Sequence, residues 1–248
     1  MKRIDFKNQN LQKSVYIFLI FTSFLWIILM GISVHYYPGG RIGDSTSEGF
    51  SFLYNPISDL GRVNGWNGEP NTVSRVLSII AINIFSLALM SYYLVIWVHF
   101  QEKKVTRWLS LLGSITGVAC SICYIILSYA AADTIYPLHK QLLTTFPIFF
   151  FLSVVLYLVV FFMKKDFPKI NAYSLTTVTL AALALGIVVA IANNQGGEFD
   201  RIARRLGNTI FNMIQTIVFC ILGFGAYIYI QRQNKIEIVR KNAKRQTT

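Results

Sequence analysis

Charged residues are scarce in this sequence. Asp, Glu, Lys and Arg make up 14% of its 248 residues, against about 25% in a typical soluble domain. Acidic residues are the rarer kind, because the chain has 11 Asp and Glu against 23 Lys and Arg. The shortage of charge argues against an ordinary soluble globule, in which such a basic excess would suggest nucleic-acid binding.

Cysteines and catalytic signatures are also few. The three cysteines, Cys120, Cys123 and Cys220, all fall in apolar stretches. We interpret the C-x-x-C pair as packing residues and expect no disulfide framework. The sequence has no H-E-x-x-H, G-x-S-x-G or P-loop pattern, so it lacks the signatures of zinc proteases, serine hydrolases and P-loop nucleotide-binding proteins.

Long apolar runs, by contrast, are abundant. Hydrophobic residues make up 54% of the chain. They form six blocks, at 14–34, 74–98, 108–131, 141–163, 171–193 and 206–230. A helix of such a block is about 31–38 Å long, enough to cross a hydrocarbon core of about 30 Å. The pattern predicts an all-α fold, a polytopic transmembrane six-helix bundle.

The basic residues collect on one side of these six spans. Sixteen of the 23 Lys and Arg, but only 4 of the 11 acidic residues, lie in the segments 1–13, 99–107, 164–170 and 231–248. The positive-inside rule places these segments in the cytoplasm. Both the N- and C-termini are then cytoplasmic, and residues 231–248 form a basic cytoplasmic tail that faces anionic lipids and not nucleic acid. We expect a multi-pass protein of the cell (plasma) membrane.

The predicted topology also bears on metal binding. His99 falls on the cytoplasmic side, opposite His35 and His139. A three-His metal site within one chain is excluded by this separation. We therefore expect neither a metal nor another cofactor.

The outer loop 35–73 is the one long connection. Loops of this length without secondary structure are uncommon unless they are functional, so we expect short helical pieces folded over the mouth of the bundle. Its apolar residues also favour packing onto the bundle. Within it we expect Asp59 to lie within ion-pair reach of an outer-face Arg, His or Lys, and Asn71 to cap the second span.

Small residues at four-residue spacing predict where helices approach closely. One such stripe is in the third span and one in the fifth: Gly113, Gly117 and Ser121, and Ala182, Gly186 and Ala190. Small side chains let helix backbones come together in lipid. Packing within the bundle is the favoured interpretation, and a dimer interface is the alternative.

The sixth span and the segment before it carry a polar stripe. Its members recur at helical spacing: Arg201, Arg205, Asn208, Asn212 and Gln215. Because polar groups in a membrane avoid lipid, we expect this face to point toward the second, third or fourth span. It forms either one wall of an outward-facing polar pocket or a set of interhelical hydrogen bonds.

Charged residues near the outer face supply the candidate chemistry. Asp59, Asp133 and His139 are the candidate catalytic residues, because carboxylates and imidazole can transfer protons. Arginines and amides suit the binding of an anionic group. The candidate ligand-binding residues are Arg62, Arg201, Arg205, Asn208 and Asn212. The alternative is that the same charges only form ion pairs that close the helix ends.

Several of these polar residues, with the string around Asp59, resemble those of a known family. The string Asn55-Pro-Ile-Ser-Asp-Leu-Gly61, Asp133 and His139 around the fourth span, and Asp200-Arg201 before the sixth resemble the DUF 998 family, prokaryotic six-span membrane proteins without a settled function. The string and the span count are also similar to the eukaryotic Frag, DRAM and Sfk membrane proteins, implicated in lipid-anchor handling and autophagy. The resemblance implies that Asp59, Asp133, His139 and Arg201 are characteristic polar positions.

The sequence favours an integral membrane protein whose outward-facing polar pocket binds or processes a lipid or anionic small molecule. Membrane lipids are its expected partners, and nucleic acid is not. A non-enzymatic membrane scaffold or chaperone is the alternative, and a small transporter is the third class. No specific reaction follows from these residues, so whether the protein is an enzyme stays open.

Overall fold

The computed structural model describes residue 6 and residues 8–246. In this part of the chain there are six α-helices, two short 3₁₀ helices and no strand. In order they are α1 (Gln9–His35), η1 (Ile57–Gly61), α2 (Thr72–Ile96), η2 (Trp97–Phe100), α3 (Lys104–Tyr129), α4 (Tyr136–Met163), α5 (Lys169–Gln195) and α6 (Gly197–Gln246). Each of the six α-helices is long and apolar enough to cross a membrane, which confirms the predicted all-α, six-helix architecture.

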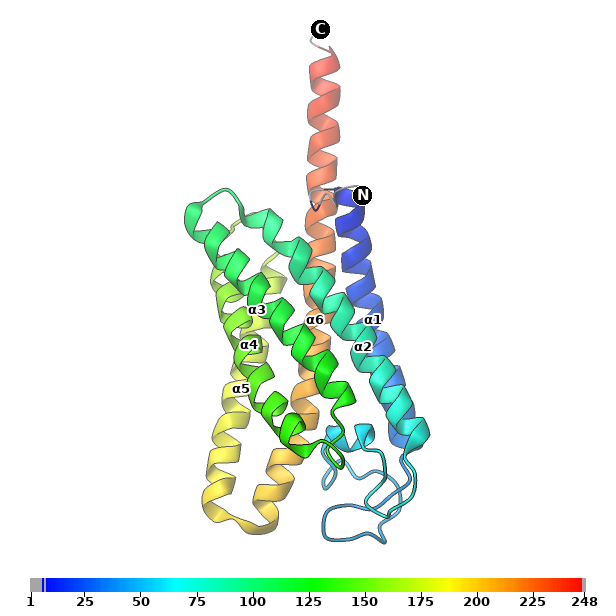
Figure 1. Cartoon of the computed structure of the whole chain (residues 1–248). Coiled ribbons are helices and arrows are strands. Elements are labelled where there is room, and N and C mark those ends of the chain that lie inside the picture. Colours follow the sequence, from blue (N-terminus) through cyan, green and yellow to red (C-terminus); the bar gives the residue numbers. More distant parts are fainter. Residues whose placement is uncertain (1–5, 7, 247–248) are drawn as a thin grey trace.

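The helices form a bundle in which each packs against its neighbours along the chain, and α6 returns to pack against α1 (Figure 1). Of these neighbouring pairs, α4 and α5 contact each other least. The beginning of α1 and the end of α6 lie at one end, which we call the termini end. Segment 36–71 and the α3–α4 and α5–α6 connections lie at the other, which we call the loop end.

Helix α6 is longer than the sequence predicts. The expected loop 194–205 is reduced to a tight turn in which Gly196 and Gly197 have φ values of 65° and 69°, a conformation that glycine adopts readily. Glu198 and Asp200 then stand in the first turn of α6, where carboxylates are favoured by the helix dipole. At its other end α6 continues to Gln246 and projects beyond the bundle (Figure 1).

Small residues and buried hydroxyls hold α2, α3 and α4 together. A Cβ at Gly113 would lie 2.9 Å from the Tyr157 ring, and one at Gly117 would lie 2.5 Å from Tyr93, so both aromatic rings fill space that a side chain would occupy. Ser114 donates to the Tyr93 carbonyl at 2.6 Å. The expected packing role of the stripe in α3 is thus confirmed. In α5, however, nothing lies within 4 Å of a Cβ at Gly186, so that stripe does not pack there.

The long segment 36–71 folds back onto the bundle, as expected. Its short helix η1 buries Leu60 and Asp59 at 0% and 2% exposure. Asn71 precedes α2 as predicted but makes no capping hydrogen bond. Its side-chain amide instead donates to the carbonyls of Asp59, Leu60 and Arg62. The segment is therefore fastened to the start of α2.

The termini end has its own polar cluster. Lys164 is buried and forms a 2.8 Å ion pair with Glu102, and its carboxylate partners keep its pKa above the ordinary lysine value despite the opposing effect of burial. Tyr16 and His99 share a hydrogen bond of 2.7 Å. His99 thus lies at the opposite end of the bundle from His139, as the sequence predicts. These contacts join η2 and the α4–α5 turn to the bundle.

Candidate functional site

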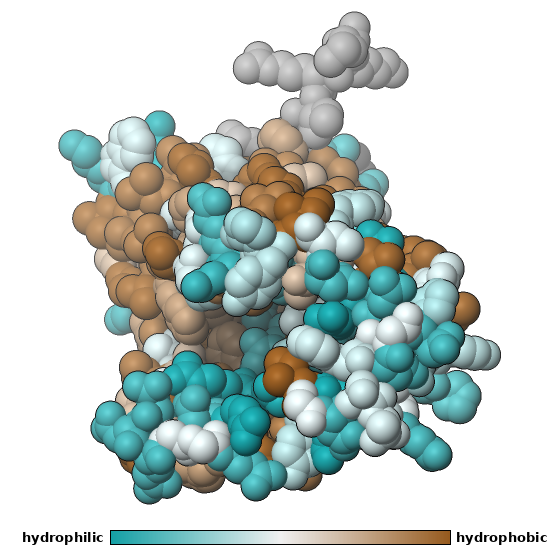
Figure 2. Space-filling view, turned by 60° about the horizontal axis from the view of Figure 1, so that its bottom comes forward, coloured by the Kyte–Doolittle hydropathy of each residue, from teal (hydrophilic) through white to brown (hydrophobic). Residues whose placement is uncertain are grey.

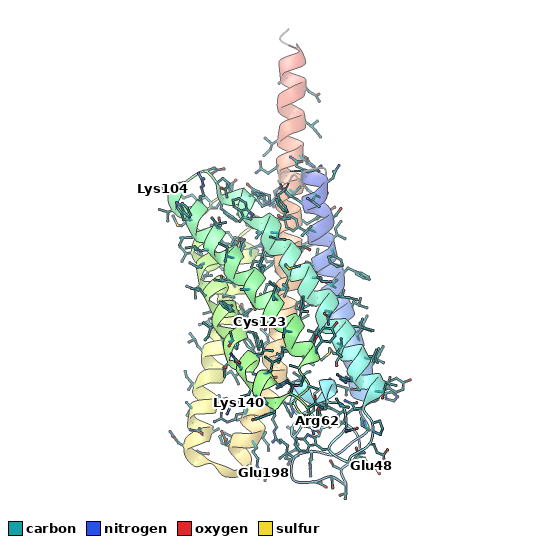
Figure 3. The ribbon with its side chains drawn as sticks, viewed as in Figure 1. Glu48, Arg62, Lys104, Cys123, Lys140 and Glu198 are labelled. Carbon is teal, nitrogen blue, oxygen red and sulfur yellow. The ribbon has the colours of Figure 1, made fainter. Side chains whose placement is uncertain are left out.

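A cavity of about 300 Å³ opens at the loop end of the bundle. Helices α1, α2, α3, α4 and α6 and the η1 region all contribute to its wall. Figure 2 shows a hollow between three groups of atoms that belong to segment 36–71, the α3–α4 connection and the α5–α6 turn. In Figure 3, Lys140 and Glu198 mark this end and Lys104 marks the opposite one.

The cavity wall is polar on one side. Arg204, Arg205, Asn208 and Asn212 line it from α6, and His139 lines it from α4. None of the described residues that line it is acidic. The lining therefore includes two guanidinium groups and, among its described residues, no carboxylate.

The rest of the wall is largely apolar, with a few hydroxyls. The apolar members include Met30, Ile57, Ile82, Leu127, Leu143 and Phe146. Tyr124 and Ser128 supply hydroxyl groups from α3. A wall of this composition suits an amphipathic ligand, because apolar surface provides burial and a few polar groups provide orientation.

His139 is held in a defined orientation. It is 5% exposed, and its Nδ1 lies 2.5 Å from the Ala130 carbonyl. Because a carbonyl oxygen only accepts hydrogen bonds, Nδ1 carries the proton. The lone pair of the neutral ring is then on Nε2, which can accept a proton or a hydrogen bond from a ligand.

The two arginines of the cavity differ in their partners. Arg204 pairs with Asp200 at 2.7 Å and donates to the Asn193 side chain at 2.9 Å. Arg205 donates to the backbone carbonyl of Tyr54, and none of the ion pairs among the described residues includes it. A guanidinium has five N–H donors, so Arg205 keeps donors for an anion.

The amides of α6 point into the bundle. Asn212 donates to the Asn208 carbonyl at 2.8 Å and accepts from the Tyr124 hydroxyl of α3 at 3.3 Å. Gln215, one turn further along, is buried. The predicted inward orientation of the stripe is confirmed for its members from Arg205 onward. Arg201, by contrast, is exposed and does not line the cavity.

Asp59 is buried within η1 of segment 36–71 and does not line the cavity. Its Oδ2 accepts hydrogen bonds of 2.9 Å from both Asn55 and Trp66. The prediction of an ion pair is wrong, because none of the ion pairs among the described residues includes Asp59. Burial raises the pKa of its carboxyl above the ordinary value. The two hydrogen bonds, and the charges of Arg62 and Arg205, lower it by less.

Asp133 also holds segment 36–71 in place by hydrogen bonds, and it does not line the cavity. Its carboxylate accepts the backbone N–H groups of Val63 and Asn64 at 2.9 to 3.1 Å. Partial burial acts to raise its pKa, but these hydrogen bonds and the charge of Arg62 lower it below the ordinary value. Arg62 itself stacks over the Trp66 ring, 3.9 Å from the centroid.

The structure thus divides the predicted site residues into two groups. The cavity is lined by His139, Arg205, Asn208 and Asn212, whereas Asp59, Asp133, Arg62 and Arg201 lie outside its lining. Sequence reasoning missed Arg204, although its spacing of four residues from Asn208 placed it on the same helix face. It also missed Tyr124, because nothing distinguishes this tyrosine from the others within the predicted spans.

Comparison with known proteins returns no match: no family model, curated protein or solved structure is similar to this chain.

Proposed function

We propose that the cavity at the loop end binds the anionic group of a lipid or of a small molecule on the outer side of the cell membrane. The observation that carries the proposal is the wall itself, in which Arg204, Arg205 and His139 stand together and none of the described lining residues is acidic. A guanidinium gives charge-assisted hydrogen bonds to phosphate or carboxylate. Those bonds are stronger where protein and lipid exclude water.

Arg205 is the expected primary contact, because no carboxylate pairs with it in the described structure. Asn208 and Asn212 supply neutral polar groups beside it. His139 lines the same cavity, and its Nε2 remains available to a ligand because the Ala130 carbonyl is bound to its Nδ1. If the protein processes its ligand, His139 is the proton-transfer residue that the cavity supports best.

The outward orientation of the cavity belongs to this proposal and rests on the asymmetry of basic residues in the sequence. A relationship to the DUF 998 family, suggested by the string from Asn55 to Gly61, is part of the same proposal.

The chain offers a matched pair of variants. Arg205→Gln removes the cavity arginine that has no carboxylate partner among the described residues, and Arg201→Gln removes an exposed charge one turn away on the same helix. We expect glycerol 3-phosphate, or nanodiscs that contain phosphatidate, to raise the unfolding midpoint of the wild type and of Arg201→Gln. A ligand at about 100 times its dissociation constant adds about 2.7 kcal/mol to stability.

The same ligands should give little or no stabilisation of Arg205→Gln. Equal responses of the two variants to both ligands would contradict the proposal.

A second candidate function is that of a non-enzymatic scaffold. The observation in its favour is that Asp59 and Asp133 both form hydrogen bonds that hold segment 36–71 in place, so these two charges are accounted for without a ligand. A scaffold would show no stabilisation by either anionic probe, in the wild type or in the variants.

A further inference from the structure

The cavity has a lateral side between α4 and α6. Leu143 and Phe146 line it from α4, Arg204 and Asn208 line it from α6, and no residue of α5 takes part among the described residues that line it. Helix α5 also packs loosely on α4. In Figure 2 the hollow runs between the α3–α4 connection and the α5–α6 turn, with apolar atoms on its left side and polar atoms on its right.

This opening is confined to the part of the bundle nearest the loop end. Further along the helices, the Phe211 ring of α6 meets those of Phe150 and Phe151 on α4, with ring centroids 6.0 and 6.1 Å apart. Between these rings and the loop end, Leu143 is 39% exposed although it lines the cavity. Leu143 therefore stands at the rim, where the cavity meets the surroundings of the bundle.

Pro147 leaves a backbone carbonyl without its helical donor at the level of Leu143. It lies inside α4 and has no N–H to donate to the carbonyl of Leu143, four residues earlier. A carbonyl left without its helical partner in a membrane needs a donor from water, protein or ligand.

The size of the cavity limits what it can enclose. At about 300 Å³ it is at the lower end of the range of ligand pockets, about 300–1,000 Å³. It accommodates an anionic head group and the first carbons of a chain, but not a whole membrane lipid. Asn208 lies about 16 Å along α6 from Gly197, at 1.5 Å per residue, so a head group beside it sits below the polar surface of the protein.

We infer that the ligand is a membrane amphiphile with one anionic group, and that it enters sideways from the bilayer between α4 and α6. Its head group lies against Arg205 and Asn208, and its chain passes Leu143 into the hydrocarbon. This inference rests on the proposed function, which requires only that an anion binds. It adds that an acyl chain provides most of the binding free energy and that the route is lateral.

The test compares two probes with the same phosphate chemistry. One is a lysophosphatidate with a single palmitoyl chain, and the other is glycerol 3-phosphate, which has no chain. Binding of the labelled lysophosphatidate is measured in phosphatidylcholine nanodiscs. We expect an excess of glycerol 3-phosphate of about a hundredfold to displace little of it, because the chain contributes most of the binding.

Two tryptophan substitutions on α4 test the route. Leu143→Trp fills the rim and should weaken binding of lysophosphatidate by about tenfold or more. Ile148→Trp is the matched control, because Ile148 is 66% exposed and does not line the cavity, and it should bind like the wild type. Equal binding by Leu143→Trp and Ile148→Trp, or full displacement by an equal concentration of glycerol 3-phosphate, would overturn the inference.

A photoreactive lysophosphatidate with a diazirine on its chain gives a second measurement in the wild-type protein, in case Leu143→Trp fails to fold. We expect cross-links to α4 around Leu143 and Phe146, and labelling confined to segment 36–71 would overturn the lateral route. Arg205→Gln separates the two proposals. If it retains binding of both probes, the proposed function fails. If Arg205→Gln loses binding, but glycerol 3-phosphate competes fully and Leu143→Trp binds like the wild type, only the lateral route fails.

Discussion

The Asp59 carboxyl shows how one buried group responds to pH. Its folded-state pKa is raised by burial, so the folded protein binds this proton more readily than the unfolded chain does. The stability that the protonated form contributes is present below about pH 4, the ordinary Asp value, and is lost as the pH rises through the folded-state pKa. At neutral pH the ionised form is buried at a cost.

Replacing this carboxyl by an amide should therefore be tolerated. Both hydrogen bonds of Asp59 are accepted by Oδ2, and the oxygen of Asn can take its place. We expect Asp59→Asn to unfold at the same or a higher temperature than the wild type at pH 7, with a difference that shrinks toward pH 4. Thermal unfolding at a fixed scan rate measures this.

Asp59→Ala is the control for the lost acceptor. It leaves the donors of Asn55 and Trp66 without their partner, which costs about 1–3 kcal/mol, and should lower the unfolding temperature at every pH. An Asp59→Asn protein less stable than the wild type by the same amount at pH 4 and pH 7 would show that burial of the charge is not the governing effect.

The glycines of α3 and α5 differ in the space around them. A Cβ at Gly117 would meet the buried Tyr93 ring, whereas one at Gly186 would meet nothing. We expect Gly117→Ala to lower stability by about 1–3 kcal/mol, the usual cost of overpacking. Gly186→Ala should be neutral or slightly stabilising, because Ala restricts the unfolded chain.

Unfolding midpoints of the two variants in the same detergent provide the comparison. A loss of stability in Gly186→Ala comparable to that in Gly117→Ala would mean that α5 packs through this stripe, for example against a second copy of the chain.

The apolar runs of the sequence are enough to predict the six helices, but the polar residues beside them make the ends of the helices hard to predict. Each run is long enough to require a span, so the six helices follow directly. The start of α6 cannot be predicted in the same way, because charged residues such as Glu198 and Asp200 are typical of a loop. In the structure, the turn at Gly196 and Gly197 places both in the first turn of α6. The small stripe of α5 likewise gives no indication of whether a partner helix faces it.

The candidate site was predictable where helix geometry decides it. The spacing of Arg205, Asn208 and Asn212 places them on one face, and the cost of turning that face to lipid directs it inward. For Asp59 and Asp133 the sequence shows a charge but not its partner. Their hydrogen bonds come from the fold of segment 36–71, which no periodicity encodes.

The basic residues of the termini end predict which end of the bundle faces the cytoplasm. Cysteines introduced at Ser45 of the loop end and at Lys235 of α6, with the three native cysteines replaced by alanine, report on it. Both sites are exposed. We expect an impermeant thiol reagent added to intact cells to label the Ser45 position and to reach the Lys235 position only after the membrane is opened.

Labelling of the Lys235 position alone in intact cells would show that the bundle has the opposite orientation, with the cavity on the cytoplasmic side. Labelling of both positions would contradict the shared location of the two termini.

The cavity at the loop end is proposed to hold an anionic group, and this group can be observed directly. The most direct measurement is a cryo-electron microscopy map of the protein, enlarged by a bound antibody fragment, in nanodiscs that contain phosphatidate. We predict density for a head group within hydrogen-bond distance of Arg205 and His139, with a chain that leaves between α4 and α6. A map in which the cavity is empty, or is filled by side chains that pair with Arg205, would show that no anionic group binds there.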